Sequence, residues 1–191
     1  MKQITQWMLV ALFALVCHIP SAWAQNQPAG IRMEVAEAET DKGDFSIFTY
    51  KDEDGTFGYY LSLGRVTKLL GAIRDDITDM SFDDIRETTI CLGATYDEAL
   101  STLNSIIDLF DKDVDTTAEF QGRATTGADR LGEPSTTNCI VDKKPVVGGK
   151  RLLFVFTSGN RQSKTYVSKT VLKELRTGLK IDKKLHPKQH R

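Results

Sequence analysis

Carboxylates are the side chains numerous enough in this chain to act together in acid–base chemistry. Two carboxylates that flank a cleft serve as general acid and general base in polymer hydrolysis, so a small carboxylate-dependent hydrolase acting on an envelope or extracellular polymer is one interpretation. Acidic loops exposed to solvent are the commoner explanation, and the sequence indicates no pair that flanks a cleft. The aspartates concerned crowd the first half of the chain, at Asp52, Asp54, Asp75, Asp76, Asp79, Asp83 and Asp84.

Histidine, the usual general base of hydrolases, is scarce. His18 lies in an N-terminal segment that we expect to be removed, and His186 and His190 lie near the C-terminus. Hydrolases of the Ser-His-Asp and Cys-His types need an imidazole held beside the nucleophile, and many zinc enzymes use histidine ligands. The sequence therefore disfavours these classes, and we predict no catalytic residue, no metal site and no cofactor.

Two stretches begin like known ligand-binding loops and then depart from them. Residues 111–115 alternate aspartates as a calcium loop does, but Thr116 stands where the turn glycine belongs and Gly122 where the bidentate glutamate belongs. Residues 148–151 resemble the end of a phosphate-binding loop, but Lys144 occupies the position of its first glycine. Neither stretch therefore predicts a bound ion or nucleotide.

The first 24 residues have the pattern of a secretory signal peptide. Lys2 gives a positive start, residues 7–16 are apolar, and Pro20 ends the apolar run. Small residues precede the bond between Ala24 and Gln25, which is the predicted cleavage site. The apolar run is about half the roughly 20 residues that span a bilayer, so we expect export without a transmembrane segment in the mature chain. The predicted location is the periplasm or the extracellular medium, and the short positive start is typical of bacteria.

Cleavage at that bond would remove Cys17 and leave Cys91 and Cys139. An even number of cysteines in an oxidising compartment most often forms disulfides, so we predict a bond between these two. Closing that loop would stabilise the fold by roughly 4 kcal/mol through the unfolded chain. The alternative is a pair of buried free thiols.

Charge is segregated along the chain. Residues 25–120 contain 8 Lys and Arg against 21 Asp and Glu, whereas residues 121–191 contain 16 against 5. We expect the two halves to fold together with their charges facing one another. The alternative is a self-assembling subunit, in which the acidic half of one copy meets the basic half of the next.

Basic side chains recur on one predicted helix near the C-terminus and form a candidate surface for an anionic partner. No nucleic-acid-binding motif accompanies them, so nucleic acid is disfavoured as the partner. A solvated helix face is the commoner explanation of such a pattern. The residues are Lys169, Lys173, Arg176, Lys180, Lys183 and Lys184.

Two hairpins and a capped helix are the clearest predicted elements. Aromatic and β-branched residues at 45–50 and 57–61 flank an Asp-Gly turn, and a similar pair follows at 152–156 and 164–167. Thr95 and Glu98 have the spacing of a capping box. Behind them an apolar stripe indicates a core-facing helix, through Tyr96, Leu100, Leu103, Ile107 and Phe110.

Further helices are expected at 66–77 and after Ser168, and a helix start at 81–84 leads into a short strand at 89–92. Short strand-like pieces occur at 118–121 and 139–141, and residues 31–39 fit either a strand or a short helix. The hairpin-plus-helix units match at an offset of 106 residues, which is compatible with an internal β-β-α duplication or with chance.

These elements predict an α+β fold, with an antiparallel sheet built from two β-hairpins and about three helices packed on one face. We expect residues 25–42 to be a flexible leader, residues 43–180 a single domain and residues 181–191 a mobile basic tail. The preferred function is a non-catalytic exported protein that binds an unidentified protein or envelope polymer.

Overall fold

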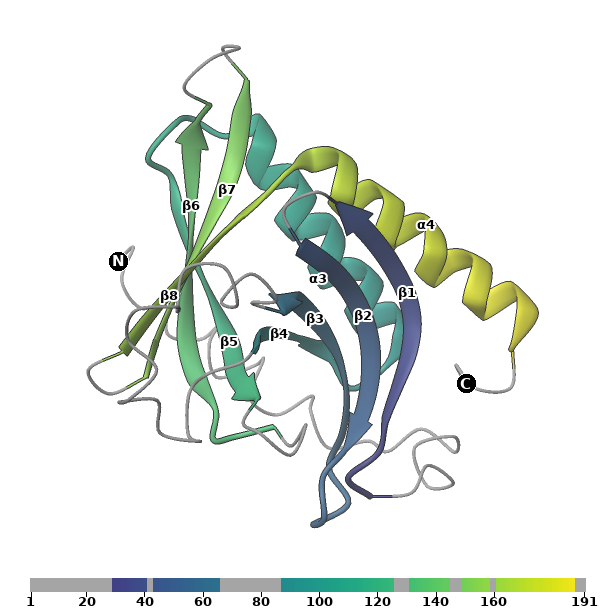
Figure 1. Cartoon of the computed structure of the whole chain (residues 1–191). Coiled ribbons are helices and arrows are strands. Elements are labelled where there is room, and N and C mark those ends of the chain that lie inside the picture. Colours follow the sequence, from purple (N-terminus) through teal and green to yellow (C-terminus); the bar gives the residue numbers. More distant parts are fainter. Residues whose placement is uncertain are drawn as a thin grey trace, which may run out of the picture.

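A computed structural model describes residues 29–40, 43–65, 87–125, 131–144, 149–158 and 161–187. Within these ranges the chain forms one antiparallel sheet in which every strand pairs with its neighbours in sequence. The sheet curves into a half-barrel (Figure 1), so β1 and β8 are its two edges. The strands are β1 (Arg32–Thr40), β2 (Gly43–Lys51), β3 (Phe57–Arg65), β4 (Glu87–Gly93), β5 (Thr117–Thr125), β6 (Ser135–Lys143), β7 (Lys150–Ser158) and β8 (Arg161–Val167).

Two helices complete the described part of the chain. Helix α3 (Tyr96–Asp108) follows β4 and continues into a short 3-10 turn, η2 (Leu109–Asp111). Helix α4 (Lys169–Leu185) follows β8. The expected sheet of two hairpins with about three helices is therefore wrong, because the described residues form a mainly antiparallel sheet of eight strands with two α-helices.

The sequence patterns do not predict the full sheet, because the strands between the two hairpins have few large apolar residues. The strands β5 and β6 were expected as short pieces, yet each runs for nine residues with Thr, Ser, Gln or Asn at many positions. The two predicted hairpins do form, as β2–β3 and β7–β8, but β4, β5 and β6 lie between them in a continuous meander. That meander gives no support to the proposed β-β-α duplication, and the helix predicted at 66–77 lies outside the described residues.

The first hairpin forms where its turn chemistry predicts. The Gly55 amide donates to the Asp52 carbonyl at 3.0 Å, and the Thr56 amide donates to the Asp54 carboxylate at 2.8 Å. Gly55 has a φ of 89°, a conformation that glycine adopts without strain. The turn therefore joins β2 and β3 in the register that the aromatic pattern requires.

One face of the sheet, which we call the helix face, packs against α3 and α4 and carries the main core. Thr95 caps α3, and Glu98 completes the predicted capping box. Ser168 caps α4 as expected, and Gly178 in α4 lies directly against Ala36 of β1. The core includes fully buried Leu61, Ile90, Leu103, Phe154 and Leu172.

The described residues include parts of the expected leader and of the expected tail. Residues 32–40 form an edge strand, although they fall within the leader expected at 25–42, and α4 continues to Leu185, inside the expected tail. The predicted signal peptide, its cleavage site and His190 lie outside the described residues. Among the residues that are described, no helix is both long and apolar enough to cross a membrane.

Candidate functional site

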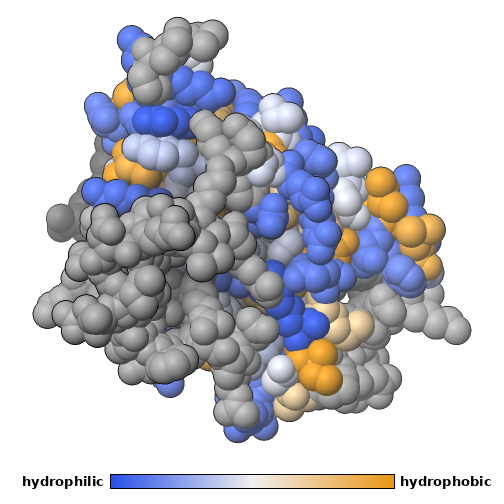
Figure 2. Space-filling view, in the orientation of Figure 1, coloured by the Kyte–Doolittle hydropathy of each residue, from blue (hydrophilic) through white to orange (hydrophobic). Residues whose placement is uncertain are grey.

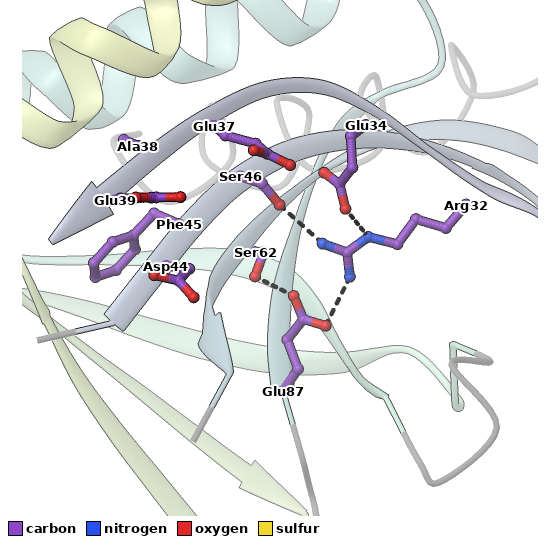
Figure 3. Close-up of a pocket in the computed structure, with 10 residues that line it drawn as sticks. All are labelled: Arg32, Glu34, Glu37, Ala38, Glu39, Asp44, Phe45, Ser46, Ser62 and Glu87. Carbon is purple, nitrogen blue, oxygen red and sulfur yellow. Dashed lines mark hydrogen bonds and ion pairs between the residues drawn. The ribbon is translucent and has the colours of Figure 1, made fainter. Parts of the chain in front are cut away.

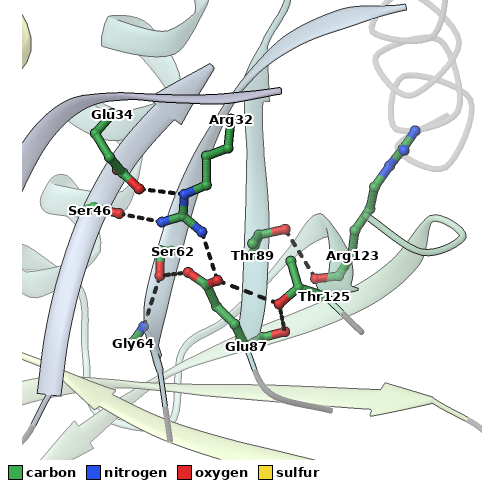
Figure 4. Close-up of polar contacts among 9 residues, drawn as sticks. All are labelled: Arg32, Glu34, Ser46, Ser62, Gly64, Glu87, Thr89, Arg123 and Thr125. Atoms are coloured by element: carbon green, nitrogen blue, oxygen red, sulfur yellow. Dashed lines mark hydrogen bonds and ion pairs between the residues drawn. The ribbon is translucent and has the colours of Figure 1, made fainter. Parts of the chain in front are cut away.

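The face opposite the helices, which we call the far face, carries a hydrogen-bonded network that joins five strands (Figure 4). Its centre is Glu87 on β4, whose side chain is 2 % exposed. The Glu87 carboxylate accepts hydrogen bonds from Arg32 on β1 at 2.7 Å, from Ser62 on β3 and from Thr125 on β5 at 3.5 Å. Arg32 also donates to Ser46 on β2 at 2.8 Å, so one chain of polar contacts ties β1 to β5.

Arg32 is the cation of this network, and its donors are engaged on every side. Its guanidinium donates to Glu87, Ser46 and Glu34, and it lies 3.8 Å above the ring of Phe48. Burial lowers the pKa of Arg32, but the hydrogen bonds and negative charges of Glu87 and Glu34 outweigh it, so the net pKa is raised. Arg32 therefore acts as a fixed positive charge that neutralises the buried Glu87.

Beside the network, a pocket of about 300 Å³ is lined by residues of β1 and β2 together with Ser62 of β3 and Glu87 of β4 (Figure 3). Arg32, Ser46, Ser62 and Glu87 line its inner part. The other lining residues include three exposed carboxylates, those of Glu37, Glu39 and Asp44. We call these three carboxylates the acidic rim.

The acidic rim is not paired with any cation of the described residues. None of its carboxylates has an ion-pair or hydrogen-bond partner within the part of the chain that the structure describes. Glu39 lies directly opposite Asp44 in the β1–β2 register, and Glu37 follows two residues away on the same face of β1. Like charges placed directly opposite one another destabilise a sheet, so the fold keeps an unfavourable arrangement here.

The structure does not contain the predicted disulfide between Cys91 and Cys139. Cys91 on β4 packs beside Phe48, Tyr50 and Tyr60 on the far face, whereas Cys139 on β6 is part of the helix-face core. Because β5 separates the two strands and the thiols lie on opposite faces, a bond would require the sheet to break. Burial raises the pKa of the Cys139 thiol to about 12.

Cys91 lines a second and smaller pocket of about 70 Å³ on the far face. Arg123 lies at the same pocket, and its guanidinium pairs with Asp52 at 2.8 Å. Of the aspartates noted in the first half, Asp52 therefore takes part in a surface ion pair and Asp54 in the hairpin turn. The other five lie outside the described residues.

The six basic residues proposed for an anionic surface all lie on α4, and three of them contact neighbouring elements. Lys169 pairs with Asp111 of η2 at 2.8 Å, Lys183 pairs with Asp97 of α3 at 3.5 Å, and Arg176 donates to Asn104 at 3.1 Å. The hydrogen bond and charge of Lys169 lower the pKa of Asp111. Exposed on the same helix are Lys173, Lys180 and Lys184.

The stretch that resembles a calcium loop and the C-terminal histidine are remote from the pocket. Asp111 is held by Lys169, and no group of three metal-binding side chains occurs in the described ranges, Asp113 and Asp115 included. His186 lies at the end of α4 with its Nδ1 2.9 Å from the Asp182 carboxylate. Neither feature adds a ligand or a base to the far-face pocket.

Sequence reasoning missed both central residues of the network. Arg32 is the one basic residue between Gln25 and Asp41, and Glu87 is a charged residue beside a predicted strand. These are weak signals, and the 55 positions between the two residues hide their contact. Comparisons with protein-family models, with curated proteins and with solved structures find no match to the chain.

Proposed function

We propose that this protein is an exported, non-catalytic binding protein that takes up cationic groups in the pocket bordered by the acidic rim. The observation in its favour is the acidic rim, in which three exposed carboxylates border a pocket of about 300 Å³ and none of them pairs with a cation of the described residues. Export is supported by the pattern of the first 24 residues. An ammonium or guanidinium group would relieve the repulsion between Glu39 and Asp44 and would donate hydrogen bonds to their carboxylates.

Two further features favour binding over catalysis and organic cations over metal ions. The buried carboxylate of the pocket, Glu87, already accepts hydrogen bonds from Arg32, Ser62 and Thr125, which leaves it badly placed to exchange protons with a substrate. The described part of the rim also contains no group of side chains arranged to hold a metal ion. A ligand that carries separated amino or guanidino groups fits the separated carboxylates of the acidic rim better than a metal ion does.

Titration calorimetry with spermidine tests the proposal. We expect heat of binding that weakens as salt is raised, because the rim carboxylates are exposed and their charge is screened. A variant with Glu37→Gln, Glu39→Gln and Asp44→Asn should lose about tenfold or more in affinity. The matched control replaces three exposed acidic residues elsewhere, Asp113→Asn, Glu119→Gln and Glu133→Gln, and should bind normally. Absence of binding, or an equal loss in both variants, would contradict the proposal.

A further inference from the structure

Strand β1 is an edge of the sheet within the part of the chain that the structure describes. Strand β1 pairs with β2 alone, and no other described strand lies on its outer side. The backbone N–H and C=O groups on the free side of an edge strand form a template for a further strand. Binding of an extended peptide in this way is a recurrent mode of recognition, with specificity supplied by alternate side chains.

The two faces of β1 differ in the side chains that they offer to such a strand. On the far face, Glu34, Glu37 and Glu39 are exposed. On the other face, Met33 of β1 is 36 % exposed, and Ile31, which directly precedes the strand, is 47 % exposed. An added strand would therefore meet carboxylates on one face and apolar side chains on the other, because successive side chains of a strand alternate between faces.

Helix α4 extends the apolar side beyond the edge. It contacts β1 more than any other strand, with Gly178 against Ala36, and its last turns then run past β1 in Figure 1. These turns carry Ile181, 50 % exposed, and Leu185, 69 % exposed, and Figure 2 shows hydrophobic surface at this end of the helix. Four of the six large apolar residues that are exposed in the described ranges thus belong to the start of β1 or the end of α4.

We propose that β1 binds an extended polypeptide segment in which Lys or Arg alternates with apolar residues. The proposal rests on the proposed function and names its partner: the basic side chains enter the pocket at the acidic rim, and the apolar ones cover Met33 and Leu185. The spacing agrees, because alternate side chains of a strand lie about 6.6–6.8 Å apart, as do Glu37 and Glu39 along β1.

A second copy of this chain fits the same edge less well. Its free edge strand, β8, places Lys164 and Tyr166 on one face but Ser163 and Thr165 on the other. Those hydroxyl side chains would leave the apolar side of β1 uncovered. The carboxylates of Glu34, Glu37 and Glu39 would also repel those of a second β1, which disfavours pairing between identical edges.

The test uses a blocked, fluorescein-labelled octapeptide of alternating lysine and valine, with binding followed by anisotropy. A peptide of the same composition, in which all lysines precede all valines, is the comparison. We expect the alternating peptide to bind about tenfold more tightly or better, because only it presents its lysines on one face. Leu185→Ser with Met33→Ser should weaken binding, whereas Val114→Ser, at an exposed apolar residue elsewhere, should not. Glu37→Lys with Glu39→Lys should abolish it, and Glu119→Lys should not.

The outcomes separate this inference from the proposed function. Equal affinity for the two peptides, with spermidine still bound, would overturn the strand-addition proposal and leave the cation pocket standing. Failure of every cation to bind would overturn both. Sedimentation of the protein alone gives a third outcome: self-association that Glu37→Lys disrupts would assign the edge to a second copy and reject the peptide.

Discussion

Opposite charges meet where α4 lies beside α3, whereas like charges meet where β1 lies beside β2. In the first region Lys169 and Lys183 each pair with an aspartate of the acidic half of the chain. In the second region Glu39 faces Asp44 across the two strands, with Glu37 close by and no cation among the described residues to separate them.

The difference shows where the segregated charge of the sequence is neutralised and where it is not. The basic C-terminal helix returns to the acidic half of the chain and balances part of it, in agreement with the expectation that the two halves fold together. That helix reaches α3 and η2 but leaves the acidic rim unbalanced. On the far face Arg32 is already engaged by Glu87 and Glu34, so the rim keeps its charge.

Removing Glu87 should have the largest effect on stability, because it takes away the buried carboxylate that pairs with Arg32 on the far face. We expect Glu87→Ala to destabilise the protein by about 3 kcal/mol, since Arg32 would remain largely buried with the exposed Glu34 as its remaining ion-pair partner among the described residues. Urea denaturation measures the change in the free energy of unfolding. The double variant Arg32→Met with Glu87→Met should lose less stability than Glu87→Ala, because the charge that it leaves unpaired, on Glu34, is exposed rather than buried.

The matched control for this substitution is Glu119→Ala, at an exposed position on β5, which should change stability by no more than about 0.5 kcal/mol. A loss below about 1 kcal/mol for Glu87→Ala would show that the network contributes little. The far face would then be held by Phe48, Tyr50 and Tyr60 rather than by its polar contacts.

The contact between the two regions is tested at Gly178, where α4 touches β1. A Cβ at this position would lie 2.7 Å from the Cβ of Ala36, closer than two carbons can approach. Alanine favours a helix over glycine by about 1 kcal/mol, whereas overpacking costs about 1–3 kcal/mol. We therefore expect Gly178→Ala to destabilise the protein by about 1 kcal/mol in thermal or urea unfolding.

A double-mutant cycle with Ala36→Gly serves as the control for this contact. Removing the opposing Cβ should make Gly178→Ala favourable, as helix propensity alone predicts. A gain in stability from Gly178→Ala without Ala36→Gly would mean that α4 lies farther from β1. The last turns of α4, which are proposed to cover an added strand, would then not be held beside β1.

Local patterns predicted the elements that local chemistry determines. The capping box of Thr95 and Glu98 and the hairpin turn at Asp52–Gly55 depend on residues close in sequence, and the structure confirms both. For the long strands β5 and β6 the sequence predicts only short pieces, because their burial comes from neighbouring strands rather than from apolar residues of their own. Propensity alone cannot supply that context.

The candidate site was less accessible to sequence reasoning than the fold. The contact between Arg32 and Glu87 depends on the register of four successive strands, and a shift of one residue would place Glu87 in the core. Strand order and side-chain alternation also separate Cys91 from Cys139, although the even number of cysteines predicts a bond between them. Both cases show that side-chain alternation, rather than residue type, decides which groups meet.

Asp44→Lys has the smallest expected effect on stability, but the sign of that effect separates a binding residue from a structural one. Asp44→Lys replaces a like-charge pair with Glu39 by an opposite-charge pair, so we expect a gain of about 0.2–1 kcal/mol that shrinks as salt is added. The same substitution places an ammonium group in the pocket and should weaken spermidine binding by about tenfold.

A residue that serves the fold alone would not separate these two measurements, because losing it would harm stability and binding together or leave both unchanged. Calorimetry and urea denaturation on the same preparations of Asp44→Lys therefore show whether the repulsion between Glu39 and Asp44 serves binding or has no role in it. Glu119→Lys makes the same charge change away from the rim and should alter neither quantity by a comparable amount. If Asp44→Lys stabilised the protein and left binding intact, the unbalanced carboxylates would have to be explained without a ligand.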